Sequence, residues 1–104
     1  MSITVILEAD VKPGRKKELL ESLMKYLPDT IKYKGFINIS IHSETDTETI
    51  IFLSQWQSIK AYQEYLQWRT DTGVMGQLSD LLMSAPKIRF LNNEISNELA
   101  WVGD

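Results

Sequence analysis

The chain has 104 residues, of which 43% are hydrophobic and 24% charged, with a net charge of -3. This length predicts one domain with a single small core. The acidic balance lacks the basic surface that binding to a phosphate backbone requires, so we expect no nucleic acid as a partner. The absence of cysteine excludes disulfides, thiolate metal sites and cysteine nucleophiles.

The first residues lead directly into an alternating apolar stretch, with no basic leader region. No window approaches the roughly 18 apolar residues of a membrane span. We therefore expect a cytoplasmic protein with no membrane association.

The first half of the chain reads as strand, helix and strand. Residues 3–11 alternate with period 2, which predicts a strand. Residues 15 to about 32 predict a helix, which Pro28 should kink or end. Residues 36–43 alternate again. The apolar arc of the helix comprises Leu19, Leu20, Leu23, Met24, Leu27 and Ile31. The second strand divides Ile37, Ile39 and Ile41 from Phe36, Asn38, Ser40 and His42.

The second half repeats the pattern after a polar turn. Residues 49–57 predict a strand, 59–70 and 73–83 two helices, and 87–92 a last strand. The order β-α-β-β-α-(α)-β predicts an α+β ferredoxin-like sandwich, a four-stranded antiparallel sheet with helices on one face. We expect the domain to span residues 1–94.

The bare sheet face predicts a second copy packed sheet to sheet, and so a homodimer. Residues 95–104 form a tail that either contacts the partner subunit or is frayed.

The helix predicted at 59–70 carries an unusual apolar half. It presents Tyr62, Tyr65 and Trp68 together with Arg69, whereas Lys60 lies on the opposite half. Aromatic rings beside one cation suggest a pocket rather than a core made only of aliphatic side chains.

Short motifs along residues 3–92 carry a family resemblance. They are Lys12-Pro13-Gly14, Leu27-Pro28-x-Thr30, Gly35, His42, Trp56, Tyr65-x-x-Trp68-Arg69-x-x-x-Gly73, Leu81-Leu82 and Pro86. In order and spacing the chain resembles the antibiotic biosynthesis monooxygenase family, the quinol monooxygenases of the dimeric α+β barrel superfamily. The resemblance implies a homodimer whose two sheets form a barrel, with a pocket between helices and sheet in each subunit. It also implies oxidation of aromatic polyketides or quinols by O2 without metal, flavin or other cofactor.

The chain departs from the family at several positions. Gln55 stands where the family often has Glu before the strand tryptophan. Leu7, Tyr65 and Met75 occupy the positions that match the Asn, Trp and His of the haem-cleaving branch, so we do not expect haem cleavage. The stretch 69–73 lacks the His that many relatives carry after the second helix.

The candidate catalytic residues are His42 and Arg69. His42 is the only histidine and the natural proton acceptor, or else an exposed residue beside a polar hairpin. Arg69 would stabilise a bound phenolate or a carboxylate of the substrate, or else pair with Asp71 or the last carbonyls of its helix. One His without Cys or clustered carboxylates predicts no metal site.

The candidate substrate-binding residues are aromatic and aliphatic side chains, each of which could equally be core. They are Phe52, Trp56, Tyr62, Tyr65, Trp68, Met75, Leu78 and Leu82. Such a pocket favours a small aromatic molecule as the ligand. The leading hypothesis is a cofactor-independent monooxygenase of an aromatic quinol, phenol or polyketide-like substrate. The alternatives are a non-catalytic dimeric ligand-binding or stress-related protein, and an isomerase or lyase of a small oxygenated metabolite.

Overall fold

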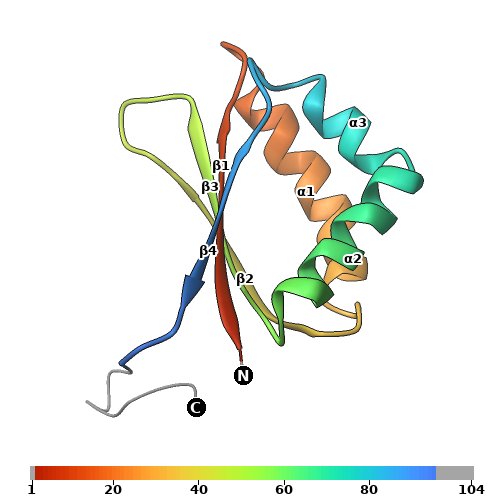
Figure 1. Cartoon of the computed structure of the whole chain (residues 1–104). Coiled ribbons are helices and arrows are strands. Elements are labelled where there is room, and N and C mark those ends of the chain that lie inside the picture. Colours follow the sequence, from red (N-terminus) through yellow and green to blue (C-terminus); the bar gives the residue numbers. More distant parts are fainter. Residues whose placement is uncertain (1, 96–104) are drawn as a thin grey trace.

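The computed structural model describes residues 2–95 and confirms the ferredoxin-like α+β fold. Each strand runs antiparallel to its neighbours, in the order β2-β3-β1-β4. Figure 1 shows the helices gathered on one side of this sheet. The elements are β1 (Ile3–Asp10), α1 (Lys16–Thr30), β2 (Phe36–Ser43), β3 (Thr49–Trp56), α2 (Ile59–Asp71), α3 (Val74–Ser79) and β4 (Lys87–Asn92).

The core lies between the helices and the helix-facing side of the sheet. β1 is a central strand, and its alternate residues Ile3, Val5, Leu7 and Ala9 are all buried. Their period of 2 is what places them together under the helices. Full burial of a large aliphatic side chain contributes about 1.5–3 kcal/mol, so this one face of β1 is a main source of stability.

A β-bulge at the start of β2 changes which residues of this strand share a face of the sheet. Phe36 pairs with Trp56, and Asn38, two residues later, pairs with Gln55, the residue adjacent to Trp56 in β3. β2 therefore contains one extra residue between these two pairs. Phe36 therefore turns to the helix side and packs edge-on against Trp56, with ring centroids 5.4 Å apart. Ile37, which simple alternation groups with Ile39 and Ile41, is 43% exposed. A shift of one residue places the side chains before the bulge on the opposite face from the one that alternation with the later residues predicts. Simple alternation therefore gave the wrong grouping at Phe36 and Ile37.

The predicted apolar arc of α1 is wider than the surface that it covers. Leu19 and Leu23 are buried, but Met24 is 76% exposed, and Leu20 and Ile31 are exposed as well. The helix also continues through its internal proline to Thr30. The proline lies in the final turns, where few intrahelical hydrogen bonds remain to be lost.

The other two helices follow the sequence closely at their starts. The hydroxyl of Ser58 caps α2 by accepting a hydrogen bond from the amide of Ala61 at 3.0 Å. α3 ends at Ser79, before the predicted residue 83, and the chain then turns so that Leu82 forms an antiparallel bridge with Val11. A helix through residue 83 could not make this bridge. Leu82 is buried all the same.

The tail was predicted either to contact a partner subunit or to be frayed, and its residues 96–104 lie outside the described residues. Within residues 2–95, no helix is long and apolar enough to cross a membrane.

Candidate functional site

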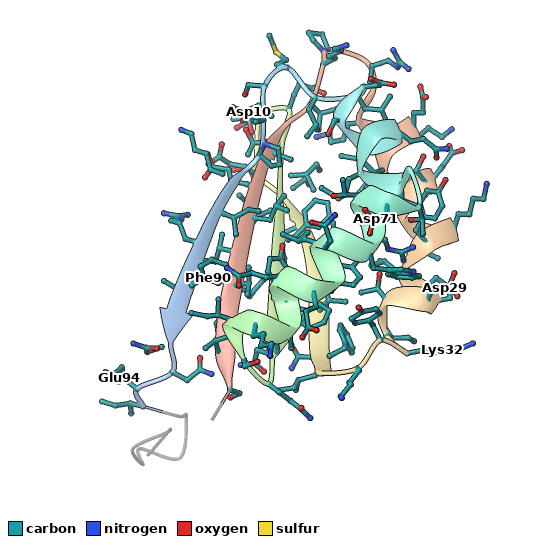
Figure 2. All side chains as sticks on the ribbon, turned by 45° about the vertical axis from the view of Figure 1, so that its right-hand side comes forward. Asp10, Asp29, Lys32, Asp71, Phe90 and Glu94 are labelled. Carbon is teal, nitrogen blue, oxygen red and sulfur yellow. The ribbon has the colours of Figure 1, made fainter. Side chains whose placement is uncertain are left out.

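A cavity of about 50 Å³ lies between the helices and the sheet. The side chains that fill this layer are drawn in Figure 2. Seven of the predicted site residues line the cavity: Phe52, Trp56, Tyr62, Tyr65, Arg69, Met75 and Leu78. The cavity is also lined by residues that were not predicted from the sequence as site residues: Leu7, Leu23, Tyr26, Leu27, Thr30, Ile39, Ser54, Leu66 and Val74. A cavity therefore lies among most of the predicted site residues, and its polar side comes partly from α1.

Arg69 is the polar centre of this cavity. The side chain projects from α2 toward α1, and the residue is only 3% exposed. Its Nη2 donates to the carbonyl oxygen of Tyr26 at 2.6 Å and to Oγ1 of Thr30 at 3.0 Å. Its Nε donates to the hydroxyl of Tyr65 at 3.3 Å. The guanidinium is thus fixed by groups on two helices.

The charge of Arg69 has no acidic partner among residues 2–95. The ion pairs there join Arg15 to Glu18 and Arg89 to Glu8. Asp71, the predicted alternative partner, instead accepts a hydrogen bond from the side chain of Gln67. The carbonyl that Arg69 contacts belongs to α1 rather than to its own helix. Its side chain therefore makes neither of the two predicted pairings, with Asp71 or with the last carbonyls of α2. A buried cation without a counter-ion favours the binding of an anion beside it.

Two hydroxyl groups complete the polar end. Thr30 Oγ1 lies 2.7 Å from the hydroxyl oxygen of Tyr65, and both contact Arg69. Thr30 is the last residue of α1 and is 1% exposed. Because the threonine hydroxyl accepts from Arg69, it can donate its own proton to Tyr65. The three side chains form one connected cluster.

Aromatic rings form part of the wall, together with the aliphatic side chains of the lining. The indole of Trp56 packs at 4.8 Å from the ring of Tyr65 and at 5.4 Å from that of Tyr62, measured between centroids. Its Nε1 donates to Ser54 Oγ at 3.1 Å, which fixes the buried ring. Burial, reinforced by the nearby Tyr65, raises the pKa of Tyr62, so Tyr62 is a neutral wall residue near neutral pH.

Three predicted site residues do not line this cavity: Trp68, Leu82 and, on the other side of the sheet, His42. Trp68 stacks on Tyr33 at 5.1 Å and covers the Arg69 guanidinium, whose Cζ lies 4.3 Å from the Trp68 ring centroid, but it does not line the cavity. Leu82 lines a second, neighbouring cavity. The roles predicted for these side chains remain predictions.

His42 lies on the other side of the sheet. It is exposed, and its Nε2 lies 2.8 Å from Ser40 Oγ. Because Ile41 faces the helices, the next residue must face away from them. His42 is therefore outside the cavity, and the geometry does not support direct proton transfer from a ligand in it. No group of three or more potential metal-ligating side chains occurs in the described part of the chain.

The comparisons with known proteins agree with this fold. The sequence pattern of the antibiotic biosynthesis monooxygenase family matches residues 2–69. No curated protein matches the sequence.

Among solved structures, a conserved protein from Methanosarcina mazei Go1 superposes with a TM-score of 0.79 at 19% identity, over 88% of this chain and 92% of that one. A Streptomyces coelicolor monooxygenase, solved with nanaomycin D, gives 0.73 at 24% identity, over 88% and 86%. The cofactor-independent oxygenase SnoaB from Streptomyces nogalater gives 0.78 at 13% identity, over 92% and 96%. The likenesses to these structures show the fold, and the match over residues 2–69 shows that the chain belongs to the antibiotic biosynthesis monooxygenase family.

Proposed function

We propose that this protein is a cofactor-independent monooxygenase that oxidises an aromatic quinol or phenol in the cavity around Arg69. The observation that carries the proposal is a buried guanidinium, free of any carboxylate within residues 2–95, at the polar end of a cavity lined by aromatic and aliphatic side chains. The family membership and the two oxygenases among the similar structures support it.

Arg69 supplies the electrostatic part of the mechanism. A fixed cation in a water-poor site favours the anionic form of a phenol, so it lowers the pKa of a bound phenol. The hydroxyls of Thr30 and Tyr65 hold the guanidinium in place, and they are close enough to it to contact the same phenolate oxygen. The substrate then binds as its anion and its proton leaves to solvent. This route requires no base in the cavity.

The anion is the electron donor for O2. One electron passes from the phenolate to O2 and gives a substrate radical and superoxide. The two combine at a ring carbon that bears hydrogen and form a C–O bond. Cleavage of the O–O bond with loss of water leaves a carbonyl, so one oxygen atom stays on the product and the other becomes water. A hydroquinone thus yields a hydroxyquinone with no external reductant.

The proposal includes a homodimer built through the open sheet face. Figure 1 shows no helix on that side of the sheet. The register places Ile51, Leu53 and Leu91 on it, and Leu53 and Leu91 are exposed in the single chain. Packing two such faces about a two-fold axis removes this apolar surface from water. His42 would then lie near the partner subunit rather than in the cavity.

A second candidate function is ligand binding without turnover. The observation that favours it is the lining of the cavity, which contains no carboxylate and no imidazole. Both candidates share the anion-binding cavity and differ only in whether O2 is consumed.

Oxygen uptake with a panel of hydroquinones tests the proposal. Arg69→Met removes the cation and should reduce the rate by about 10²–10³-fold, the cost of one lost charge-stabilising donor. Arg69→Lys keeps the charge but not the three contacts, and should fall between. His42→Ala is the matched control and should leave the rate unchanged. Binding without O2 uptake would favour the second candidate, and a loss of activity in His42→Ala alone would move the chemistry away from Arg69.

A further inference from the structure

A second cavity of about 40 Å³ adjoins the first beneath α3. The two cavities share four lining residues, Leu7, Phe52, Met75 and Leu78. All the surface that the second cavity presents is apolar, and it ends at Leu82 and Pro86, toward β4. Polar groups that could bind a ligand therefore lie only at the Arg69 end, and the other end offers only apolar contact.

The side chain of Met75 and the helix α3 that carries it can both change position readily. Met75 is unbranched and adapts its shape to its neighbours. It belongs to the six-residue helix α3, which follows Gly73 in the left-handed conformation at φ 84° and contains Gly76. So short a helix has little stability of its own. An exposed hydrogen bond from the hydroxyl of Tyr26 to Oε1 of Gln77 ties α3 to α1, and water can replace such a bond at little cost.

The volume of each cavity limits the size of the ligand group that it can hold. Both cavities, of about 50 Å³ and 40 Å³, exceed the roughly 10–15 Å³ that a single water-sized group needs, so each accepts only a few heavy atoms. A phenol has seven heavy atoms and does not fit the first cavity as it stands. A bound ring would have to displace a lining side chain, and of the four residues that line both cavities Met75 is the one that adapts its shape most readily. A ligand that enlarges one cavity thus gains access to the other.

We propose that the substrate is an amphiphilic phenol or quinol, with its hydroxyl at Arg69 and an alkyl tail of about three to four carbons in the cavity between Ala9, Leu82 and Pro86. This inference rests on the proposed function and specifies the substrate class of the same site. A hydroxyl at one end of the ring and a tail at the opposite end match the two unlike ends of the joined cavities.

The probes are phenol and its 4-ethyl, 4-propyl, 4-butyl and 4-hexyl derivatives. Their binding is measured by NMR titration, with the indole N–H of Trp56 and the amides of α3 as reporters. Each methylene should tighten binding about fourfold, the gain expected for a buried CH2, until the tail fills the second cavity at about three to four carbons. Beyond that length the affinity should level off.

Ala9→Leu supplies the decisive variant. Ala9 is buried and lines only the second cavity, so the larger side chain fills it and leaves the Arg69 end unchanged. The dependence on chain length should disappear, while phenol itself should still bind. If Ala9→Leu does not fold, Ala9→Val fills less of the cavity and should shorten the tail at which the affinity levels off.

Three results would overturn the inference. An affinity in the wild type that does not change with chain length, while phenol binds, refutes the tail site and leaves the proposed function intact. An unchanged dependence on chain length in folded Ala9→Leu places the tail elsewhere. If no member of the series binds, the site for the phenol head fails too, and with it the proposed function.

Discussion

The hydroxyl of Thr30 offers the sharpest test of how the buried cation is held. Thr30→Val keeps the shape of the side chain and replaces the hydroxyl with a methyl group. It removes the acceptor of the Arg69 Nη2 hydrogen bond at 3.0 Å and the contact of 2.7 Å with Tyr65. Valine and threonine have similar helix propensities, so the end of α1 is otherwise little affected.

The magnitude follows from the two contacts. A hydrogen bond to a charged group contributes about 1.5–3 kcal/mol and a neutral one about 0.5–1.5 kcal/mol, so their joint loss should lower the free energy of unfolding by about 2–4.5 kcal/mol. Thr30→Ser is the matched control. It retains the hydroxyl and loses one buried methyl group, which should cost about 0.5–1.5 kcal/mol.

The assay is denaturant unfolding of all three proteins at one protein concentration, because association would add to the apparent stability. The valine variant should be the least stable of the three and the serine variant intermediate. The reasoning is refuted if Thr30→Val unfolds within about 0.5 kcal/mol of the wild type, or if Thr30→Ser is the less stable variant.

Three further predictions concern stability. At Gly35, with φ 90°, an added Cβ would lie 2.6 Å from the Cβ of Ala61, so Gly35→Ala should destabilise by about 2–5 kcal/mol. Thermal melts should show partial recovery when Ala61→Gly is added, and full recovery would mean that the backbone conformation costs nothing. At Gly76 an added Cβ meets nothing within 4 Å, so Gly76→Ala should stabilise α3 by about 0.5–1 kcal/mol; a lower melting temperature would contradict this. The raised pKa of Tyr62 means that the unfolded chain loses this proton first, from about pH 10, so stability should fall as pH rises further, by up to about 1.4 kcal/mol per unit. Tyr62→Phe should lessen that slope in urea titrations, and an identical slope would assign the alkaline loss to other groups.

The sequence predicted the fold because each strand buries one face only. The alternation of β1 and the turn signals between elements were sufficient for the order of strands and helices. The bulge in β2 could not be read, because a bulge changes pairing between strands and leaves the local pattern of residues unaltered. Simple alternation therefore grouped Phe36 with His42 and Ile37 with Ile41, whereas Phe36 lies on the helix side and Ile37 is exposed.

The site was predictable on α2 and β3, and much less so on α1. Arg69 stood out as a cation within an aromatic face of a helix. Its contacts could not be found by spacing, because Thr30 and Tyr26 lie 39 and 43 residues before it in the chain. Two signals were present but unused: Ser54 alternates with Phe52 and Trp56 on β3, and Thr30 is a polar residue at the end of an apolar helix face. Because successive residues of a strand face opposite sides of the sheet, the partial burial of Ile41 on the helix side also places His42 on the face opposite the cavity.

The central claim is that the Arg69 cavity binds a phenol as its anion, and the ionisation of a bound phenol measures this directly. The probe is 4-nitrophenol, whose anion is yellow, titrated with pH in the presence and absence of excess protein. In the wild type the apparent pKa of the bound probe should lie below that of the free probe, and Arg69→Met should abolish or reverse this shift. A bound probe whose pKa is unchanged or raised in the wild type would contradict the account, because an apolar cavity without an effective cation would produce that result.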